Sequence, residues 1–221
     1  MRSQMSRGTS GPGNLPPNGR ARGRMGTRWD VTEQTQTSAL PEGAISEWKP
    51  SRATWWLWTV AMLPIFLVAL GAYIFIATHG ETHATGSASL PQIVLVVALS
   101  VGILCVHEGV HGIVMIAFGA RPQFGLLMTK VGPMGLYATA PGNRFGRRQY
   151  LLICLAPLGV LAPLGALACW LPVGGYLVLP LAIHAAGCVG DVTIAWHVLR
   201  APSGAACEDM RDGTRFWKPE A

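Results

Sequence analysis

One segment of the chain has residue types and a spacing that suit metal-dependent hydrolysis, His107-Glu108-Gly109-Val110-His111. On an α-helix, residues at i and i+4 project from one face, so the two histidines can bind one tetrahedral zinc ion. Glu108 points to the same neighbourhood, and its expected role is general base catalysis on a water whose pKa the metal lowers. The motif therefore predicts a hydrolytic zinc site with His107 and His111 as ligands and Glu108 as the catalytic residue.

An HExxH match can also arise by chance, and an accidental match would be expected in a polar segment. Here the motif lies inside an apolar run, from Leu90 to Phe118. Burying two histidines and a glutamate at bilayer depth costs roughly several kcal/mol unless they are paired or bound to a metal. The apolar setting thus favours a metal site.

A catalytic zinc ion usually has three protein ligands, so the two histidines require a third. Of the 11 Asp and Glu residues, only Glu108 and Asp191 fall inside long apolar stretches. Counted from the ends of their helices, His107 and Asp191 lie at similar depths, about 16 and 14 Å. Asp191 is therefore the expected third ligand, and the alternative is that it pairs with another buried donor.

Two further residues could support or replace that ligand. His184 precedes Asp191 on nearly the same helical face but lies about 10 Å further along the axis. Both could bind one ion only if the helix is broken, which Gly187 and Gly190 would allow. Otherwise His184 would contact a ligand residue without binding the ion itself. Cys188 would be either a soft alternative ligand or a small apolar residue that fills space.

The elements that must position these residues are membrane helices. Half of the residues are apolar, 13% are charged and the mean hydropathy is +0.36, a balance that soluble domains of this size rarely show. The stretches that are long and apolar enough to cross a bilayer are 54–78, 90–118, 150–171 and 176–199. We expect an all-α integral membrane protein with four transmembrane helices, of which the second carries the motif and the fourth carries Asp191.

Basic residues predict the orientation of these helices. All 17 Lys and Arg residues lie in 1–52, 119–149 and 200–221, and none lies between the first and second spans or between the third and fourth. The positive-inside rule then places both termini and the central loop in the cytoplasm of a multi-pass protein, for which we expect the cell membrane. Contact with anionic lipid headgroups accounts for the net charge of +6, and nucleic acid is not expected as a partner.

The composition also predicts the domain organisation. Residues 1–50 are rich in Gly, Pro, Ser, Thr and Arg, and are expected to form a disordered basic cytoplasmic tail that can touch lipid headgroups. Residues 51–200 form the membrane domain, and 201–221 are expected to form a cytoplasmic C-terminal tail. The cytoplasmic loop between the second and third helices, 119–149, alternates enough to predict a short β-hairpin with Gly132-Pro133 at its turn. Such a hairpin could bind a substrate by strand addition, and the alternative is a simple connector.

The combination of motifs resembles a known family. HEGVHG in an apolar span is followed by GARPQFG, then by LYATAPGNRFGRRQYLLICLAPLGVL, and finally by HAAGCVGDV. Over roughly residues 50–217 the chain looks like the membrane family described as putative zincin peptidases. The resemblance implies a four-span helical protein similar in logic to site-two proteases, with His107 and His111 as zinc ligands, Glu108 as base and Asp191 as third ligand. The Leu-Asp-Gly and Asn-Pro-Asp-Gly signatures of true site-two proteases are lacking.

The leading functional hypothesis is an enzyme, a membrane-embedded zinc metalloendopeptidase that cleaves membrane or membrane-adjacent protein or peptide substrates. The first alternative is a non-hydrolytic metal-binding adaptor or pseudoprotease. The second is a transporter that uses Glu108 and Asp191 as an ion relay, although four spans without an internal repeat offer little machinery for alternating access.

Overall fold

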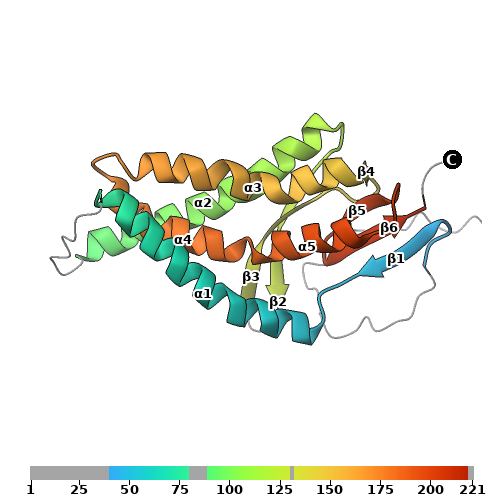
Figure 1. The fold of residues 1–221 in the computed structure, drawn as a ribbon, viewed down its shortest axis with the longest axis horizontal. Helices are drawn as coiled ribbons and strands as arrows, with labels where there is room; N and C mark the ends of the chain where they lie inside the picture. Colours follow the sequence, from blue (N-terminus) through green and yellow to red (C-terminus); the bar gives the residue numbers. More distant parts are fainter. Residues whose placement is uncertain (1–39, 80–88, 130–131, 219–221) are drawn as a thin grey trace, which may run out of the picture.

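The computed structural model describes residues 40–79, 89–129 and 132–218. Within these residues, 4 helical segments are long and apolar enough to cross a membrane. They are α1 (Arg52–Ala77), α2 (Leu90–Ala117), α3 (Arg147–Ala168) and a fourth that comprises the 3-10 turn η1 (Gly174–Tyr176), α4 (Val178–Gly187) and α5 (Val189–Arg200). The predicted spans are therefore present, with ends that shift by a few residues. In Figure 1, α4 and α5 lie between α1 and α3.

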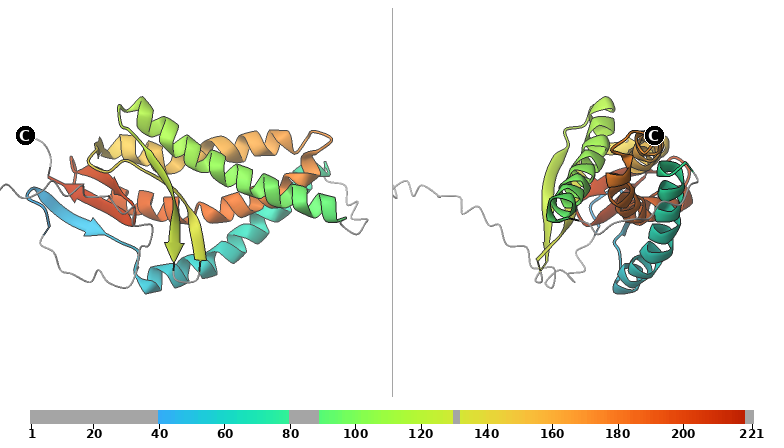
Figure 2. Two further views of the ribbon diagram at one scale, coloured as in Figure 1. Left: turned by 180° about the vertical axis from the view of Figure 1, so that it is seen from behind. Right: turned by 90° about the vertical axis from the view of Figure 1, so that its left-hand side faces the viewer.

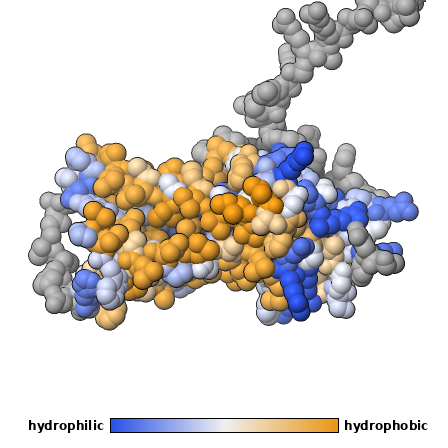
Figure 3. Space-filling view, turned by 90° about the horizontal axis from the view of Figure 1, so that it is seen from above, coloured by the Kyte–Doolittle hydropathy of each residue, from blue (hydrophilic) through white to orange (hydrophobic). Residues whose placement is uncertain are grey.

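The helices expose their apolar side chains instead of burying them. In the most apolar windows of α1 and α2, only 6% of the residues are buried inside the protein. Figure 3 shows these side chains as a broad apolar belt, with hydrophilic residues gathered towards the two ends of the molecule. Exposing such a belt to water would be unfavourable, whereas it matches the hydrocarbon core of a bilayer.

The fourth span is not the single continuous helix that its hydropathy suggests. The helix is interrupted at Cys188, which ends α4 and precedes α5. Hydrogen bonds still run from Cys188 N–H to the His184 carbonyl and from Val192 N–H to the Cys188 carbonyl. The flanking residues Gly187 and Gly190 give the backbone the freedom for this break without a proline.

The hairpin predicted between the second and third helices is present and packs against the membrane helices. β2 (Gln123–Thr129) pairs antiparallel with β3 (Gly132–Thr139), and Gly125 stands opposite Tyr137. Gly132 and Pro133 belong to β3 and not to the turn, because the connection falls at 130–131, outside the described residues. β3 packs against α2, and Figure 2 shows the hairpin crossing the side of the helical bundle.

The expectation of an otherwise all-α protein is wrong, because a second sheet covers one end of the bundle. Its strand order is β1-β6-β5-β4, and every pairing is antiparallel. The strands are β1 (Ala44–Trp48), β4 (Arg144–Gly146), β5 (Ala206–Met210) and β6 (Gly213–Trp217). Parts of both segments expected to be tails are thus ordered strands, whereas the basic residues of 1–39 lie outside the described residues.

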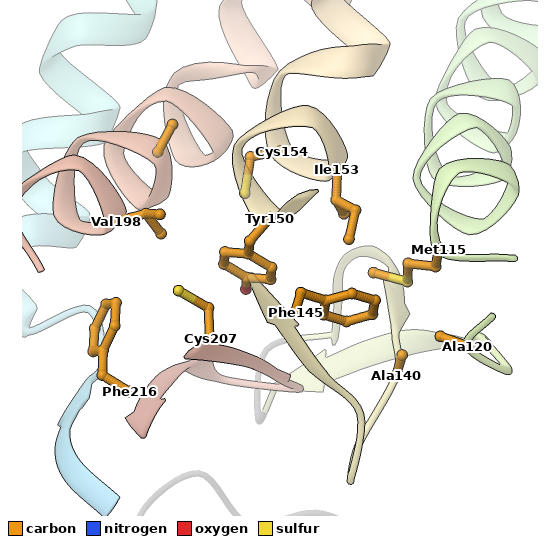
Figure 4. Close-up of a cluster of buried hydrophobic side chains, with 11 residues drawn as sticks. Met115, Ala120, Ala140, Phe145, Tyr150, Ile153, Cys154, Val198, Cys207 and Phe216 are labelled. Carbon is orange, nitrogen blue, oxygen red and sulfur yellow. The ribbon is translucent and has the colours of Figure 1, made fainter. Parts of the chain in front are cut away.

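A buried core joins this sheet to the helices. It includes Met115 from α2, Tyr150 and Ile153 from α3, Cys207 from β5 and Phe216 from β6, as Figure 4 shows. The hydroxyl of Tyr150 donates a hydrogen bond of 2.7 Å to Asp209 Oδ1 and lies 3.1 Å from Thr214 Oγ1. The sheet therefore fixes the first turns of α3, which continue directly to the candidate site.

Candidate metal centre

Helix α2 presents both histidines of the motif to the protein interior. The residues His107 and His111 are each 8% exposed, and their Nε2 atoms lie 3.1 Å apart. This is the arrangement that the i, i+4 spacing predicts, because both side chains project from one helix face.

Asp191 meets the two histidines from α5, close to the break in the fourth span. Its Oδ2 lies 3.3 Å from Nε2 of His107, and its Oδ1 lies 3.5 Å from Nε2 of His111. Helices α2 and α5 therefore bring together the residues whose depths we predicted to be similar. The three residues offer ligand atoms that all lie within 4.8 Å of one another.

These separations fit a tetrahedral zinc ion. Nitrogen and oxygen ligands sit about 2.0–2.1 Å from zinc, so two of them at the tetrahedral angle lie about 3.3–3.4 Å apart. The two histidine Nε2 atoms are 3.1 Å apart, and they lie 3.3 and 3.5 Å from an oxygen of Asp191, Oδ2 for His107 and Oδ1 for His111. Two neutral imidazoles and a carboxylate are also a common catalytic donor set for zinc, with a fourth position left for water.

The backbone of α3 fixes the orientation of one ligand. Nδ1 of His111 lies 2.7 Å from the carbonyl oxygen of Ile153, and a carbonyl can only accept, so Nδ1 must carry the proton. The lone pair of His111 is therefore on Nε2, the atom that faces Asp191 and His107. Ile153 is one helical turn after Tyr150, so the sheet and the ligand are connected through α3.

Glu108 lies beside the cluster but is not one of the three residues whose side chains could together bind the metal ion. Its carboxylate accepts a hydrogen bond from the backbone N–H of Ala138 in β3. It also lines a cavity of about 330 Å³, open to the outside, between α2 and the hairpin. The other lining residues are mostly apolar and come from both elements: Cys105, Phe124, Gly125, Leu136 and Tyr137.

A glycine allows the hairpin to approach the motif closely. A Cβ atom at Gly112 would lie 2.4 Å from Cζ of Phe124, so no larger residue fits there unless the ring moves. At Gly109 a Cβ would meet nothing within 4 Å. Of the two glycines in and beside the motif, Gly112 is therefore the one required by packing.

His184 and Cys188 lie on the Nδ1 side of the His107 ring, whereas the carboxylate of Asp191 lies on its Nε2 side. Sγ of Cys188 lies 4.0 Å from Nδ1 of His107 and 3.7 Å from Nε2 of His184. Together with His107 they form a second group of potential metal ligands. His184 therefore does not join His111 and Asp191 as a ligand of the same set.

Sequence reasoning missed the polar residues that support the site from the second sheet. Asp209 accepts from Tyr150, and Thr139 Oγ1 donates to the Asp209 carbonyl at 3.1 Å. Burial raises the pKa of the Asp209 carboxyl to about 6, although the hydrogen bond from Tyr150 opposes the rise. A signal was available, since Asp212-Gly213 followed by alternating polar and apolar residues is typical of a hairpin turn.

The fold and the site together define a class: a helical protein with membrane-length spans and two buried histidines that meet a half-buried aspartate beside a glutamate. A family model with the description "putative zincin peptidase" matches residues 100–206, a segment that holds every residue of this cluster. The match covers just under half of the chain and confirms the predicted resemblance to this family over those residues. No curated protein and no solved structure matches the chain.

Proposed function

We propose that this protein is a membrane-embedded zinc metalloendopeptidase. The observation that carries the proposal is that His107, His111 and Asp191 place their ligand atoms within 4.8 Å of one another in an apolar helical bundle, next to a glutamate that lines an open cavity. The family match supports the same class of activity. Ion transport has less support, because four spans without an internal sequence repeat offer little machinery for alternating access.

Each residue has a distinct role in this proposal. His107, His111 and Asp191 hold the metal, and the Ile153 carbonyl keeps Nε2 of His111 available for it. Zinc, when bound, lowers the pKa of water and polarises the peptide carbonyl. Glu108 takes the proton from the attacking water and delivers it to the leaving amine, while the Ala138 N–H orients its carboxylate.

The hairpin is the proposed substrate-binding element. In the described part of the chain, β2 and β3 pair only with each other, which leaves an unpaired edge on each strand. An extended peptide segment added to such an edge would present an accessible peptide bond to the cavity beside Glu108. A helical membrane segment would have to unwind before it could bind in this way.

The orientation completes the proposal. β1 pairs with β6, so the segment before α1 and the segment after α5 lie at the same end of the bundle. We place that end, which also carries the basic residues, in the cytoplasm.

Zinc content and hydrolysis test the proposal together. We expect the detergent-purified wild type to hold about one zinc ion per chain, and Glu108→Gln to hold the same amount. Glu108→Gln should lower the cleavage of a tagged single-span reporter protein in proteoliposomes on the order of 10²–10⁴-fold. Elemental analysis and gel mobility of the reporter are the measurements.

A variant that lacks one of the proposed metal-binding side chains provides the second half of this test. Asp191→Ala should release its zinc to a chelator far more readily than the wild type and should cleave no reporter. A wild type that holds no metal even after zinc is supplied would exclude a zinc peptidase. Equal cleavage by Glu108→Gln would remove Glu108 from the mechanism.

A further inference from the structure

The break in the fourth span creates a second set of metal-ligating side chains beside the first. Cys188 lies at the break, one helical turn after His184, and its Sγ is 3.7 Å from Nε2 of that histidine. The same sulfur is 4.0 Å from Nδ1 of His107 on α2. The exposed fractions of His184, Cys188 and His107 are 1%, 1% and 8%, so water does not solvate these groups.

The geometry of this set suits a thiophilic ion. Zinc lies about 2.3 Å from sulfur and about 2.0–2.1 Å from nitrogen, which at the tetrahedral angle separates the two ligand atoms by about 3.6 Å. The observed sulfur–nitrogen distances of 3.7 and 4.0 Å are close to this value. One thiolate and two imidazoles, without a carboxylate, form a softer donor set than His107, His111 and Asp191 do.

The surroundings of His184 do not explain its burial by hydrogen bonding. Among the described residues, its Nδ1 is the buried side-chain nitrogen or oxygen that has no hydrogen-bond partner. The hydrogen bond that His111 donates to the Ile153 carbonyl has no counterpart at His184 among the described residues. The polar contact that the structure gives His184 is instead the sulfur of Cys188.

The two sets share His107 through different ring nitrogens. Nε2 faces His111 and Asp191, whereas Nδ1 faces Cys188. A neutral imidazole has a lone pair on only one nitrogen, so His107 can bind an ion on one side or the other but not on both. Occupation of the two sets is therefore mutually exclusive at neutral pH.

We infer that His107, Cys188 and His184 form an alternative station for the metal ion, in which the ion is held away from Asp191. Binding there displaces the proton of the Cys188 thiol, as thiolate ligation requires. The station gives the protein a metal-loaded state without hydrolytic activity, a consequence that rests on the proposed function. The metal site itself can be tested without any substrate.

Cobalt is the probe, because a thiolate bound to Co²⁺ gives a charge-transfer absorption band that imidazole and carboxylate ligands do not give. We expect Asp191→Ala to hold one Co²⁺ per chain with a strong thiolate band, since the hydrolytic set has lost a ligand. Cys188→Ser should hold one Co²⁺ without the band. The double variant Asp191→Ala, Cys188→Ser should bind Co²⁺ at least tenfold more weakly than Asp191→Ala does.

The matched control is Asp191→Ala with Cys169→Ser, because Cys169 is equally buried but belongs to a separate cluster with Tyr73 and Val178. This variant should keep the thiolate band. If the Cys188 double variant does not fold, as judged by circular dichroism and elution volume, Asp191→Ala with His184→Asn replaces it and should also bind at least tenfold more weakly.

Two results would overturn the inference: an Asp191→Ala chain that holds no cobalt, or one whose thiolate band survives replacement of Cys188. Either result leaves the hydrolytic site intact, because one Co²⁺ without a thiolate band in the wild type would still support it. A wild type that binds neither zinc nor cobalt would instead overturn both proposals.

Discussion

At the scale of single residues, the site depends on which nitrogen of each histidine is available. The Ile153 carbonyl fixes His111 with its lone pair on Nε2. Among the residues that the structure describes, the contact at Nδ1 of His107 is the sulfur of Cys188 and not a carbonyl or carboxylate. His111 is therefore fixed in a single tautomer, whereas His107 can carry its lone pair on Nε2, which faces Asp191, or on Nδ1, which faces Cys188.

Asp209 gives a prediction about pH at this scale. Its folded-state pKa of about 6 lies above the ordinary value of 3.8, so the folded protein binds more protons than the unfolded chain between these values. The contribution of this carboxyl to the free energy of unfolding is fully present below about pH 4 and is lost as the pH rises to about 6. Asp209→Asn should therefore gain stability relative to the wild type over this interval, on the order of 2 kcal/mol.

Unfolding in mixed micelles at pH 4, 5, 6 and 7 measures this difference. Asp212→Asn is the control, because it makes the same change in charge on a carboxylate whose side chain is 57% exposed. A stability difference between Asp209→Asn and the wild type that does not change with pH would show that Asp209 ionises like an exposed carboxyl.

At the scale of elements, the contact between α2 and the hairpin sets the shape of the cavity beside Glu108. Gly112→Ala should push the Phe124 ring away, since the new Cβ would lie 2.4 Å from its Cζ. Overpacking of this kind costs about 1–3 kcal/mol, and we expect a lower unfolding free energy together with slower cleavage. Phe124→Ala in the same chain should restore the stability lost through the clash.

Gly109→Ala is the matched control, because it adds the same methyl group to the same helix where nothing lies within 4 Å. It should leave stability unchanged or raise it by up to about 1 kcal/mol. Equal effects of the two alanine substitutions would show that the hairpin does not press on α2.

The elements also show which parts of the fold are predictable from sequence. The spans follow from hydropathy, and His107, His111 and Asp191 follow from spacing and depth, because helix geometry is regular. The break at Cys188 was only allowed for, on the strength of Gly187 and Gly190, since no proline marks it and hydrogen bonds on both sides of it persist. The β1-β6-β5-β4 sheet was missed because its strands are at most 5 residues long and come from distant segments.

At the scale of the whole molecule, we expect both ends of the membrane domain to lie on one side, because the spans are even in number and β1 pairs with β6. Single cysteines test this after Cys105, the exposed native cysteine, is changed to serine. We expect a membrane-impermeant maleimide to label Ser89→Cys on intact cells, and Ser203→Cys only after permeabilisation. The reverse pattern would invert the orientation, and labelling of both from outside would exclude four spans.

The pairing of β1 with β6 also determines when the second sheet can form. Arg215 in β6 and Glu47 beside it in β1 are 168 residues apart in the chain and are joined by hydrogen bonds of 2.9 and 3.1 Å. During synthesis β1 leaves the ribosome before the four spans and stays without its partner until β6 has followed them. The sheet that packs against Tyr150 therefore forms only after α3 and its neighbours have been made. A chain that stops before β6 would keep its four spans but would lack the strand that pairs with both β1 and β5.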